Sequence, residues 1–427
     1  MIKTNITSFF IVVSALYSFS LRGQSKEKNI IAFQGAHIFN GKTFKKKNFY
    51  SVNGVLSFKK RTYTDTIYNL DGMYVIPPFG DAHTHNLDRE WQLRFLPKKY
   101  LLEGTFYVQN LTSKFKETQK TRPFFKSKET PDVKFAHQGL TSTIGHPFMA
   151  YEPFAMGLPY EDWNDNLDSI RGSRIDLDNS YIFIDDVTSI DEKLKIYFKE
   201  PPDIAKIFLI NSENHESNFG NKTIGDNGLS IEVAEEVVKR LKKQNLKVYA
   251  HIESAYDFEK GIDMGVDYFA HMPGYNWNGS PDTKAKYFIN NKLINKAVRN
   301  KVGIIPTLGQ GFSRKLKDSV AKREFMKDFL VRFHKKGGKL IFGADAFNQT
   351  MSGEIALLME LKIFDSKTIL QMLCIETPKA IFPNRKIGEL KEGFEASFLV
   401  LKEDPLKDIV ALKNIHLLIK QGIEISK

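Results

Sequence analysis

Apolar residues recur along the middle of the chain in short runs, and amphipathic helical stretches separate them. Each run is short enough to be a buried strand, and together they alternate with helices in the manner of βαβ units. The strand candidates are Val75–Pro77, Thr105–Leu111, Val133–Gly139, Ile204–Ile210, Lys247–Ile252, Tyr268–His271, Gly303–Thr307 and Lys339–Gly343. Eight strands with intervening helices predict an α/β fold of the (β/α)8 TIM-barrel type, whose functional site lies at the carboxyl ends of the strands.

The clearest of the intervening helices is predicted over Ser230–Asn245. Ser230 is a suitable N-cap, and glutamates early in the segment with lysines late in it complement the helix dipole. Apolar residues recur at helical spacing at Ile231, Ala234, Val238 and Leu241. The segment joins the fourth strand candidate to the fifth, as a crossover between parallel strands requires.

Both ends of the chain contain short strand-like runs separated by Gly, Asn, Lys and Pro. These runs are Asn29–Phe33, Ala36–Phe39, Asn48–Leu56, Thr64–Leu70, Ala396–Lys402 and Ile415–Ile423. Their pattern predicts that the two ends combine into one small composite β-sandwich domain. The expected division is residues 25–75 and 387–427 for this domain, and 76–386 for the barrel.

Two stretches interrupt the alternation of strands and helices. Lys114–Pro131 is a basic excursion after the second strand candidate, and Pro147–Pro202 is a long one, rich in aromatic residues at its start, after the third. Long loops at this end of a barrel shape or cover a site. We expect the second excursion to be mainly a packed subdomain, with a few residues facing the site.

The first residues have the layout of a secretory signal peptide. Lys3 precedes the apolar run Phe9–Tyr17, and small and polar residues follow it up to Ser25. An N-terminal membrane anchor is the alternative, which the shortness of the apolar run disfavours. We therefore predict a signal peptide over residues 1–24 and an exported protein, periplasmic or secreted by a bacterium, with no membrane attachment after cleavage. Cys374 is the only cysteine, so no internal disulfide can form.

The 427-residue chain carries a formal net charge of +12. A basic protein can bind nucleic acid, but here the lysines are scattered and no basic helix or aromatic-basic motif occurs, so we expect a solvated surface and no nucleic-acid partner. The expected partner is a small-molecule substrate. The sequence leaves open whether the protein forms a homo-oligomer.

The candidate chemistry begins at Asp81-Ala82-His83-Thr84-His85, just after the first strand candidate. Two histidines two residues apart in an extended segment point to the same side, so both imidazoles can reach one metal ion, and Asp81 can orient a ring by a hydrogen bond. The alternative is a pair of surface histidines on a loop. Residues on other strands must decide between the two interpretations.

Four more ligand-type residues lie within or just after later strand candidates. They are Lys206, His251, His271 and Asp345. Each alone has an ordinary structural explanation, but five strands that each carry such a residue predict a metal site. Lys206 lies inside an apolar strand, where an unpaired ammonium is costly. A partner carboxylate or carboxylation by CO₂, which makes the lysine an anionic metal ligand, would remove that cost.

At these residues the chain resembles the amidohydrolase superfamily, over nearly all of its length after the signal peptide. The matching positions are Asp81-Ala82-His83-Thr84-His85, Lys206, His251, His271 and Asp345 in family order, together with the closing segment Ile387–Val400, in which Ser397 replaces the usual aspartate. The resemblance implies a barrel with a composite β-sandwich. It is closest to members in which a carboxylated lysine bridges two metal ions, often zinc. Gly145-His146 is similar to the Gly-His of prolidase-like members, where the histidine contacts substrate.

The resemblance implies a hydrolase in which a metal-bound hydroxide cleaves a carbon–nitrogen bond of an amide, a cyclic amide or a dipeptide. His83, His85 and Asp345 would bind the first ion and His251 and His271 the second. Lys206 would bridge them, Asp345 would act as base and then acid, and His146 would stabilise the oxyanion. Two alternatives remain: a mononuclear deaminase or imidazolone-type hydrolase with an unmodified Lys206, and a periplasmic metal- or ligand-binding protein without catalysis.

Overall fold

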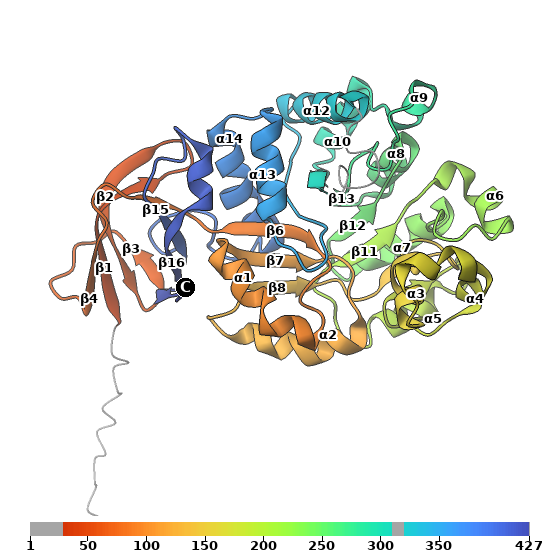
Figure 1. The fold of residues 1–427 in the computed structure, drawn as a ribbon, viewed down its shortest axis with the longest axis horizontal. Coiled ribbons are helices and arrows are strands. Elements are labelled where there is room, and N and C mark those ends of the chain that lie inside the picture. Colours follow the sequence, from red (N-terminus) through yellow and green to blue (C-terminus); the bar gives the residue numbers. More distant parts are fainter. Residues whose placement is uncertain (1–28, 310–319, 427) are drawn as a thin grey trace, which may run out of the picture.

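Parallel strands form the centre of the molecule, and a mixed sheet built from both chain ends lies at one side of it (Figure 1). The computed structural model describes residues 29–309 and 320–426. The predicted signal peptide, residues 1–24, lies outside the described residues. Among the described residues, no helix is both long and apolar enough to cross a bilayer.

The central strands pair in parallel in two sheets, as the alternation of strands and helices predicts. One sheet contains β6 (Phe79–Thr84), β7 (Thr105–Asn110) and β8 (Asp132–Phe135); the other contains β9 (Gly139–Thr141), β10 (Tyr181–Phe183), β11 (Ala205–Phe208), β12 (Val248–His251), β13 (Tyr268–Ala270) and β14 (Gly303–Ile305). They are buried throughout except for the start of β8, as expected for a sheet with both faces covered.

The first strand of the central region was placed wrongly by the sequence. Val75 belongs to β5 (Tyr74–Ile76), which pairs with strands of the end sheet. The first central strand is β6, beyond the two prolines, and the His-x-His motif starts inside it. The prolines mark the passage from one sheet to the other, because neither can donate a ladder hydrogen bond.

The predicted eighth strand, Lys339–Gly343, forms a single bridge instead of a strand. Leu340 bridges to Ile304 of β14 in parallel, and Ala82 of β6 donates its backbone N–H to the carbonyl of Phe342 at 2.9 Å. The segment therefore makes hydrogen bonds to an edge strand of each parallel sheet.

Helices surround the central strands and cover their faces (Figure 1). The described α-helices are α1 (Leu96–Leu102), α2 (Phe115–Thr121), α3 (Phe148–Ala155), α4 (Leu167–Gly172), α5 (Ile190–Tyr197), α6 (His215–Gly220), α7 (Ile231–Lys243), α8 (Ala255–Met264), α9 (Lys284–Tyr287), α10 (Asn291–Arg299), α12 (Val320–Lys335), α13 (Ser352–Leu361), α14 (Ser366–Leu370) and α15 (Thr377–Ile381). α7 confirms the predicted crossover helix: Ser230 caps it by accepting from the Val233 N–H, and its apolar face is buried.

The two chain ends combine in one sheet, as predicted. It contains β1 (Ile30–Phe39), β2 (Phe44–Val52), β3 (Val55–Ser57), β4 (Thr66–Asn69), β5, β15 (Phe398–Leu401), β16 (Ile415–Lys420) and β17 (Ile423–Glu424). The expected single strand Asn48–Leu56 is instead a hairpin of β2 and β3. Asn53 and Gly54 form its turn, both with positive φ, which is the Asn-Gly signal of a two-residue hairpin loop.

The long excursion Pro147–Pro202 is a packed subdomain, as expected, and it also contributes a strand that the sequence did not predict. It contains α3, α4, β10 and α5, and β10 pairs in parallel with β9. Phe148, Tyr151 and Ile170 pack in a hydrophobic cluster of its own. Of these, Tyr151 also lines the pocket described below.

Candidate metal centre

The predicted ligand residues come together at the carboxyl ends of the parallel strands. β6 ends in His83 and Thr84, β11 carries Lys206, and β12 ends at His251. His85 and His271 directly follow β6 and β13, and Asp345 lies two residues after the Lys339–Gly343 segment. All six side chains line one pocket of about 230 Å³.

His83, His85 and Asp345 form the tightest part of this cluster. Oδ1 of Asp345 lies 3.2 Å from Nε2 of His83 and 3.0 Å from Nε2 of His85. One potential ligand atom from each of the three lies within 4.8 Å of the others. Two imidazole nitrogens and a carboxylate oxygen at this spacing are suitable ligands for a divalent ion such as Zn²⁺.

The close approach of Asp345 to β6 depends on Gly343. A Cβ atom at Gly343 would lie 2.4 Å from the backbone nitrogen of His83, so only glycine fits here. Two residues later, the N–H of Asp345 donates to the carbonyl oxygen of His83 at 2.6 Å, and Asp345 has a φ of 50°. This strained backbone turns the carboxylate toward both histidines.

His251 and His271 form a second pair of rings beside the first group. Their centroids are 4.5 Å apart, and the His271 ring lies 5.0 Å from that of His83. Lys206 is 1% exposed, and its Nζ has no hydrogen-bond partner among the described residues. An unpaired amine in this position, between two groups of ligand-type side chains, is the feature that a bound metal or a covalent modification would satisfy.

Burial and neighbouring charges favour the protonation states that metal ligands need at His83, His271, Asp345 and Lys206. Burial lowers the pKa of Lys206 to about 7, and it lowers the pKa values of His83 and His271 well below their usual value. Burial alone would raise the pKa of Asp345, but His83, His85 and His271 outweigh it and hold that pKa well below its usual range. The centre therefore contains an ionised Asp345 carboxylate, neutral imidazoles at His83 and His271, and a Lys206 amine that loses its proton near pH 7.

Hydrogen bonds at the outer ring nitrogens orient three of the histidines. Nδ1 of His85 is 3.1 Å from the Thr112 carbonyl oxygen, and Nδ1 of His271 is 2.6 Å from the Thr307 hydroxyl. Nε2 of His251 is 3.3 Å from Oε1 of Glu253. Contacts of this kind at one ring nitrogen are usual for metal-binding histidines, because they fix the orientation of the ring.

The sequence did not identify Glu253 as part of the site. Its carboxylate also accepts from the Nδ2 amide of Asn276, and both side chains line the pocket. A signal was present: Glu253 lies two residues after His251, so the two side chains leave the chain on the same side. Without the fold, however, an acidic residue after a strand resembles a helix cap.

Asp81 does not orient a histidine ring, contrary to the sequence-based expectation. Its Oδ1 accepts the backbone N–H groups of His83 and Ala344, both at 3.1 Å, and its Oδ2 accepts from the Tyr100 hydroxyl at 3.2 Å. Asp81 thus ties β6 to the chain segment that carries Asp345. Burial raises the pKa of this carboxyl to about 7.

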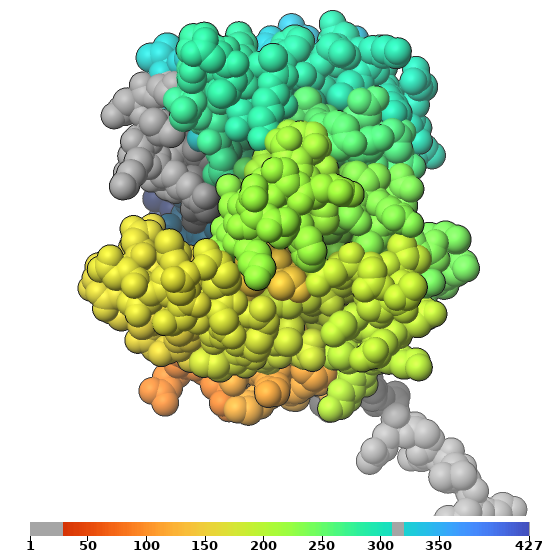
Figure 2. Space-filling model, turned by 90° about the vertical axis from the view of Figure 1, so that its right-hand side faces the viewer, coloured from red at the N-terminus to blue at the C-terminus, as the bar shows by residue number. Residues whose placement is uncertain are grey.

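His146 lies in the same pocket, as expected. Its ring centroid is 4.7 Å from that of His251 and 5.2 Å from that of Phe208. The hydroxyl of Tyr275 donates to Oδ2 of Asp345 at 3.1 Å. Figure 2 shows the side of the molecule where the segments around α3 and α4 (yellow) and around α6 (yellow-green) form the surface near these strand ends.

Comparison with known proteins gives matches only among solved structures, since no protein-family model and no curated protein matches the chain. An Xaa-Pro dipeptidase with bound methionine is 17% identical with a TM-score of 0.70, over 93% of this chain and 100% of that one. An amidohydrolase is 16% identical with a TM-score of 0.67, over 93% and 98%. The ochratoxinase of A. niger is 16% identical with a TM-score of 0.71, over 94% and 96%.

The chain has the amidohydrolase fold. The resemblance found in the sequence is thereby confirmed at the level of the architecture, which extends over nearly the whole length of these structures. The identities are too low to transfer an activity, so the function of the centre must be argued from its own residues.

Proposed function

We propose that this protein is a metal-dependent hydrolase of carbon–nitrogen bonds in amides, cyclic amides or dipeptides. One observation carries the proposal: His83, His85 and Asp345 share a pocket with an unpaired, buried Lys206 and with two further histidines. A protein that only binds a metal would not need an ionised carboxylate held in a strained backbone conformation at the ligand group. Two of the similar structures are of a dipeptidase and an amidohydrolase, which is in keeping with the proposal.

The metal would be held by the residues that the sequence singled out. His83, His85 and Asp345 would bind one ion, His251 and His271 a second, and Lys206, carboxylated, would bridge them. The lowered pKa of Lys206 supports carboxylation, because only the neutral amine reacts with CO₂. A bound divalent ion, Zn²⁺ being the expected one, lowers the pKa of water to about 7 and polarises a carbonyl oxygen.

Side chains of the pocket would carry out the proton transfer and stabilise the oxyanion. Asp345 would take the proton of the attacking hydroxide and pass it to the leaving nitrogen, a role that needs a carboxylate that stays ionised until substrate is bound. Tyr275 holds Oδ2 of Asp345 by its hydrogen bond, and this leaves Oδ1 facing His83 and His85. His146 reaches the same pocket and stabilises the negative charge that develops on the carbonyl oxygen.

The proposal also includes the closure of the barrel, the nature of the end domain and the export of the protein. We infer a closed (β/α)8 barrel over residues 76–386, supported by the hydrogen bonds of the Leu340 segment to β14 and β6. We infer further that the sheet of residues 25–75 and 387–427 is a composite β-sandwich. We also propose that residues 1–24 are removed as a signal peptide and that the protein is exported to the periplasm or the medium.

The test combines metal analysis of the mature protein with turnover of dipeptides, N-acyl amino acids and cyclic amides. Two metal equivalents and cleavage of a panel member support the proposal. One equivalent at full activity favours the mononuclear alternative with an unmodified Lys206. A fully metal-loaded protein that cleaves no member of the panel contradicts the proposal and favours a non-catalytic binding protein.

Asp345→Asn provides the sharpest test of the mechanism. The amide cannot take up the proton, so we expect kcat to fall by about 100- to 10,000-fold, the range usual for loss of a general base. Metal content should stay near that of the wild type, because the amide oxygen can still bind an ion. Elemental analysis and kcat are measured on the same preparation, and retained turnover would reject the role of Asp345.

A further inference from the structure

An aspartate of the pocket wall has a carboxylate that no other described residue binds. Asp226 is exposed and lines the same pocket as the candidate metal centre. Among the described residues, its carboxylate has no hydrogen bond and no ion pair. We propose that Asp226 binds an ammonium group of the substrate that lies next to the carbonyl under attack. This inference rests on the proposed hydrolase function and names a substrate class for it.

Backbone hydrogen bonds on both sides of Asp226 hold it against the chain segment of His146. The N–H of Gly225 donates to the carbonyl oxygen of Ile144 at 2.9 Å, and the N–H of His146 donates to the carbonyl oxygen of Asn227 at 2.8 Å. Asp226 lies between these two contacts. The fold therefore places it directly beside His146 at the pocket.

The loop around α6 supports Asp226 from its other side. The side-chain amide of Asn218 in α6 donates to the backbone carbonyl oxygen of Asp226 at 3.0 Å. This segment forms the yellow-green part of the surface near the strand ends (Figure 2). The backbone of Asp226 is thus fixed by three hydrogen bonds in or next to it, while its carboxylate is left for another partner.

The position of His146 indicates which part of a substrate Asp226 can reach. The centroid of the His146 ring is 4.7 Å from that of His251, so His146 lies at the centre itself. In the proposed mechanism His146 stabilises the charge on the carbonyl oxygen. A group bound by the neighbouring Asp226 must then be close to that carbonyl. An α-ammonium meets this condition, because only the α-carbon separates its nitrogen from the carbonyl carbon.

The charges around Asp226 favour a cation at this place. Outside the candidate ligand group, the charged residues that line the pocket are Asp226 and Glu253, both acidic. Lys286 is the cation within electrostatic reach of Asp226, but it lies 3.6 Å from Glu213 and donates to the side chain of Asn211. Burial and the charge of Glu253 raise the pKa of the Asp226 carboxyl. A substrate ammonium would offset both effects through a charge-assisted hydrogen bond.

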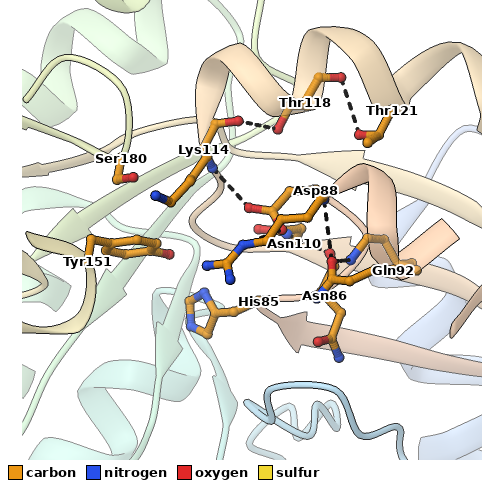
Figure 3. Close-up of polar contacts among 12 residues, drawn as sticks. His85, Asn86, Asp88, Gln92, Asn110, Lys114, Thr118, Thr121, Tyr151 and Ser180 are labelled. Carbon is orange, nitrogen blue, oxygen red and sulfur yellow. Dashed lines mark hydrogen bonds and ion pairs between the residues drawn. The ribbon is translucent and has the colours of Figure 1, made fainter. Parts of the chain in front are cut away.

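The basic side chains near His85 are already paired, so they do not reverse this charge. Figure 3 shows Lys114 and Asp88 near His85, with the hydrogen bond of 3.0 Å between the Lys114 N–H and the Asp88 carboxylate. The ammonium of Lys114 lies 2.7 Å from Asp176, and Nε of Arg89 lies 4.0 Å from Asp88. The substrate class that follows is a dipeptide or aminoacyl amide with a free α-amino group.

The experiment compares glycyl-L-leucine with propionyl-L-leucine, in which a methyl group replaces the ammonium, on the metal-loaded full-length mature enzyme. In Asp226→Asn we expect KM for glycyl-L-leucine to rise by about 10-fold, with kcat changed far less and with propionyl-L-leucine unaffected. Asp226→Glu keeps the charge at a shifted position and should lie between. Glu216→Gln, which removes an exposed carboxylate of α6 outside the pocket wall, is the matched control.

Binding of the two compounds to metal-loaded Asp345→Asn, measured by calorimetry, gives a readout that needs no turnover. Tighter binding of glycyl-L-leucine than of propionyl-L-leucine, lost when Asp226→Asn is added, supports the inference even if the wild type cleaves neither compound. Absence of cleavage would count against the proposed function alone. Equal binding of the two compounds before Asp226→Asn is added, or a preference that survives this substitution, would overturn the role of Asp226 while leaving hydrolysis intact.

Discussion

Oxygen atoms of neighbouring residues contact one ring nitrogen in three of the four histidines of the candidate ligand group. A carbonyl at Thr112, a hydroxyl at Thr307 and a carboxylate at Glu253 each contact one nitrogen of a histidine. Ligating histidines need such partners, since the second hydrogen bond fixes both the tautomer and the ring orientation. Glu253 is the only one of the three partners that carries a charge, so it should matter most for metal affinity.

Glu253→Ala is expected to weaken metal binding by about 10- to 100-fold, because His251 loses the acceptor that orients its ring. The dissociation constant is measured by competition with a chelating dye. Glu253→Gln keeps an acceptor oxygen and should restore most of the affinity, while Glu259→Ala, on the exposed side of α8, is the control. An affinity unchanged in Glu253→Ala would show that the ring is held by packing alone.

Elements around the centre hold the strand ends in place through buried polar groups. α13 positions the Glu354 carboxylate so that it accepts the N–H of Leu308 at 2.9 Å and that of Gly309 at 2.8 Å, just after β14. Burial raises the pKa of Glu354 to about 8, from 4.5 in a solvated glutamate. Between pH 4.5 and pH 8, Glu354 is therefore protonated in the folded state and ionised in the unfolded state.

This difference predicts a pH effect on stability. Because the folded state binds more protons than the unfolded state between pH 4.5 and 8, the contribution of Glu354 to stability falls as the pH rises through that window. Glu354→Gln does not titrate, so its melting temperature relative to wild type should increase by a few degrees from pH 5 to pH 8. Thermal unfolding at several pH values measures this. A constant difference would contradict it, and Glu360→Gln, exposed on the same helix, is the control.

At the scale of the whole molecule, a buried ion network joins the end sheet to the central strands. Lys420 of β16 is 1% exposed and lies 2.8 Å from Asp132 at the start of β8. Arg385 contacts the same aspartate at 2.8 Å and also binds Glu395. The sheet built from both chain ends is thus tied to the region that carries the centre.

Lys420→Met should lower the free energy of unfolding by about 2 kcal/mol, since it leaves the Asp132 carboxylate with only Arg385 as a charged partner. The midpoint of urea denaturation reports the loss, and Lys413→Met, in an exposed position before β16, should leave the midpoint unchanged. Turnover of the folded variant should stay near wild type, because the network is far from the pocket. A midpoint equal to that of wild type would mean that apolar packing alone holds the end sheet.

The sequence by itself determined the alternation of strands and helices and pointed to the candidate ligand residues. Periodicity located the α7 helix and most of the parallel strands, because burial on both faces leaves continuous apolar runs. It placed the first strand wrongly, since Tyr74–Ile76 and Phe79–Thr84 are both apolar and only pairing distinguishes the sheet to which each belongs. It also missed the hairpin at Asn53 and Gly54.

Only the tertiary structure decided how the ligand residues meet and what surrounds them. Residues as far apart in the sequence as His83 and Asp345 reach one pocket because parallel strands end on the same side, and Gly343 lets one segment lie against the backbone of His83. The sequence predicted that Asp81 orients a histidine ring. In the structure its carboxylate instead accepts the backbone N–H groups of His83 and Ala344 and so joins two backbone segments. The contact of Glu253 with Asn276 depends on the fold, and such contacts leave no periodic pattern in a sequence.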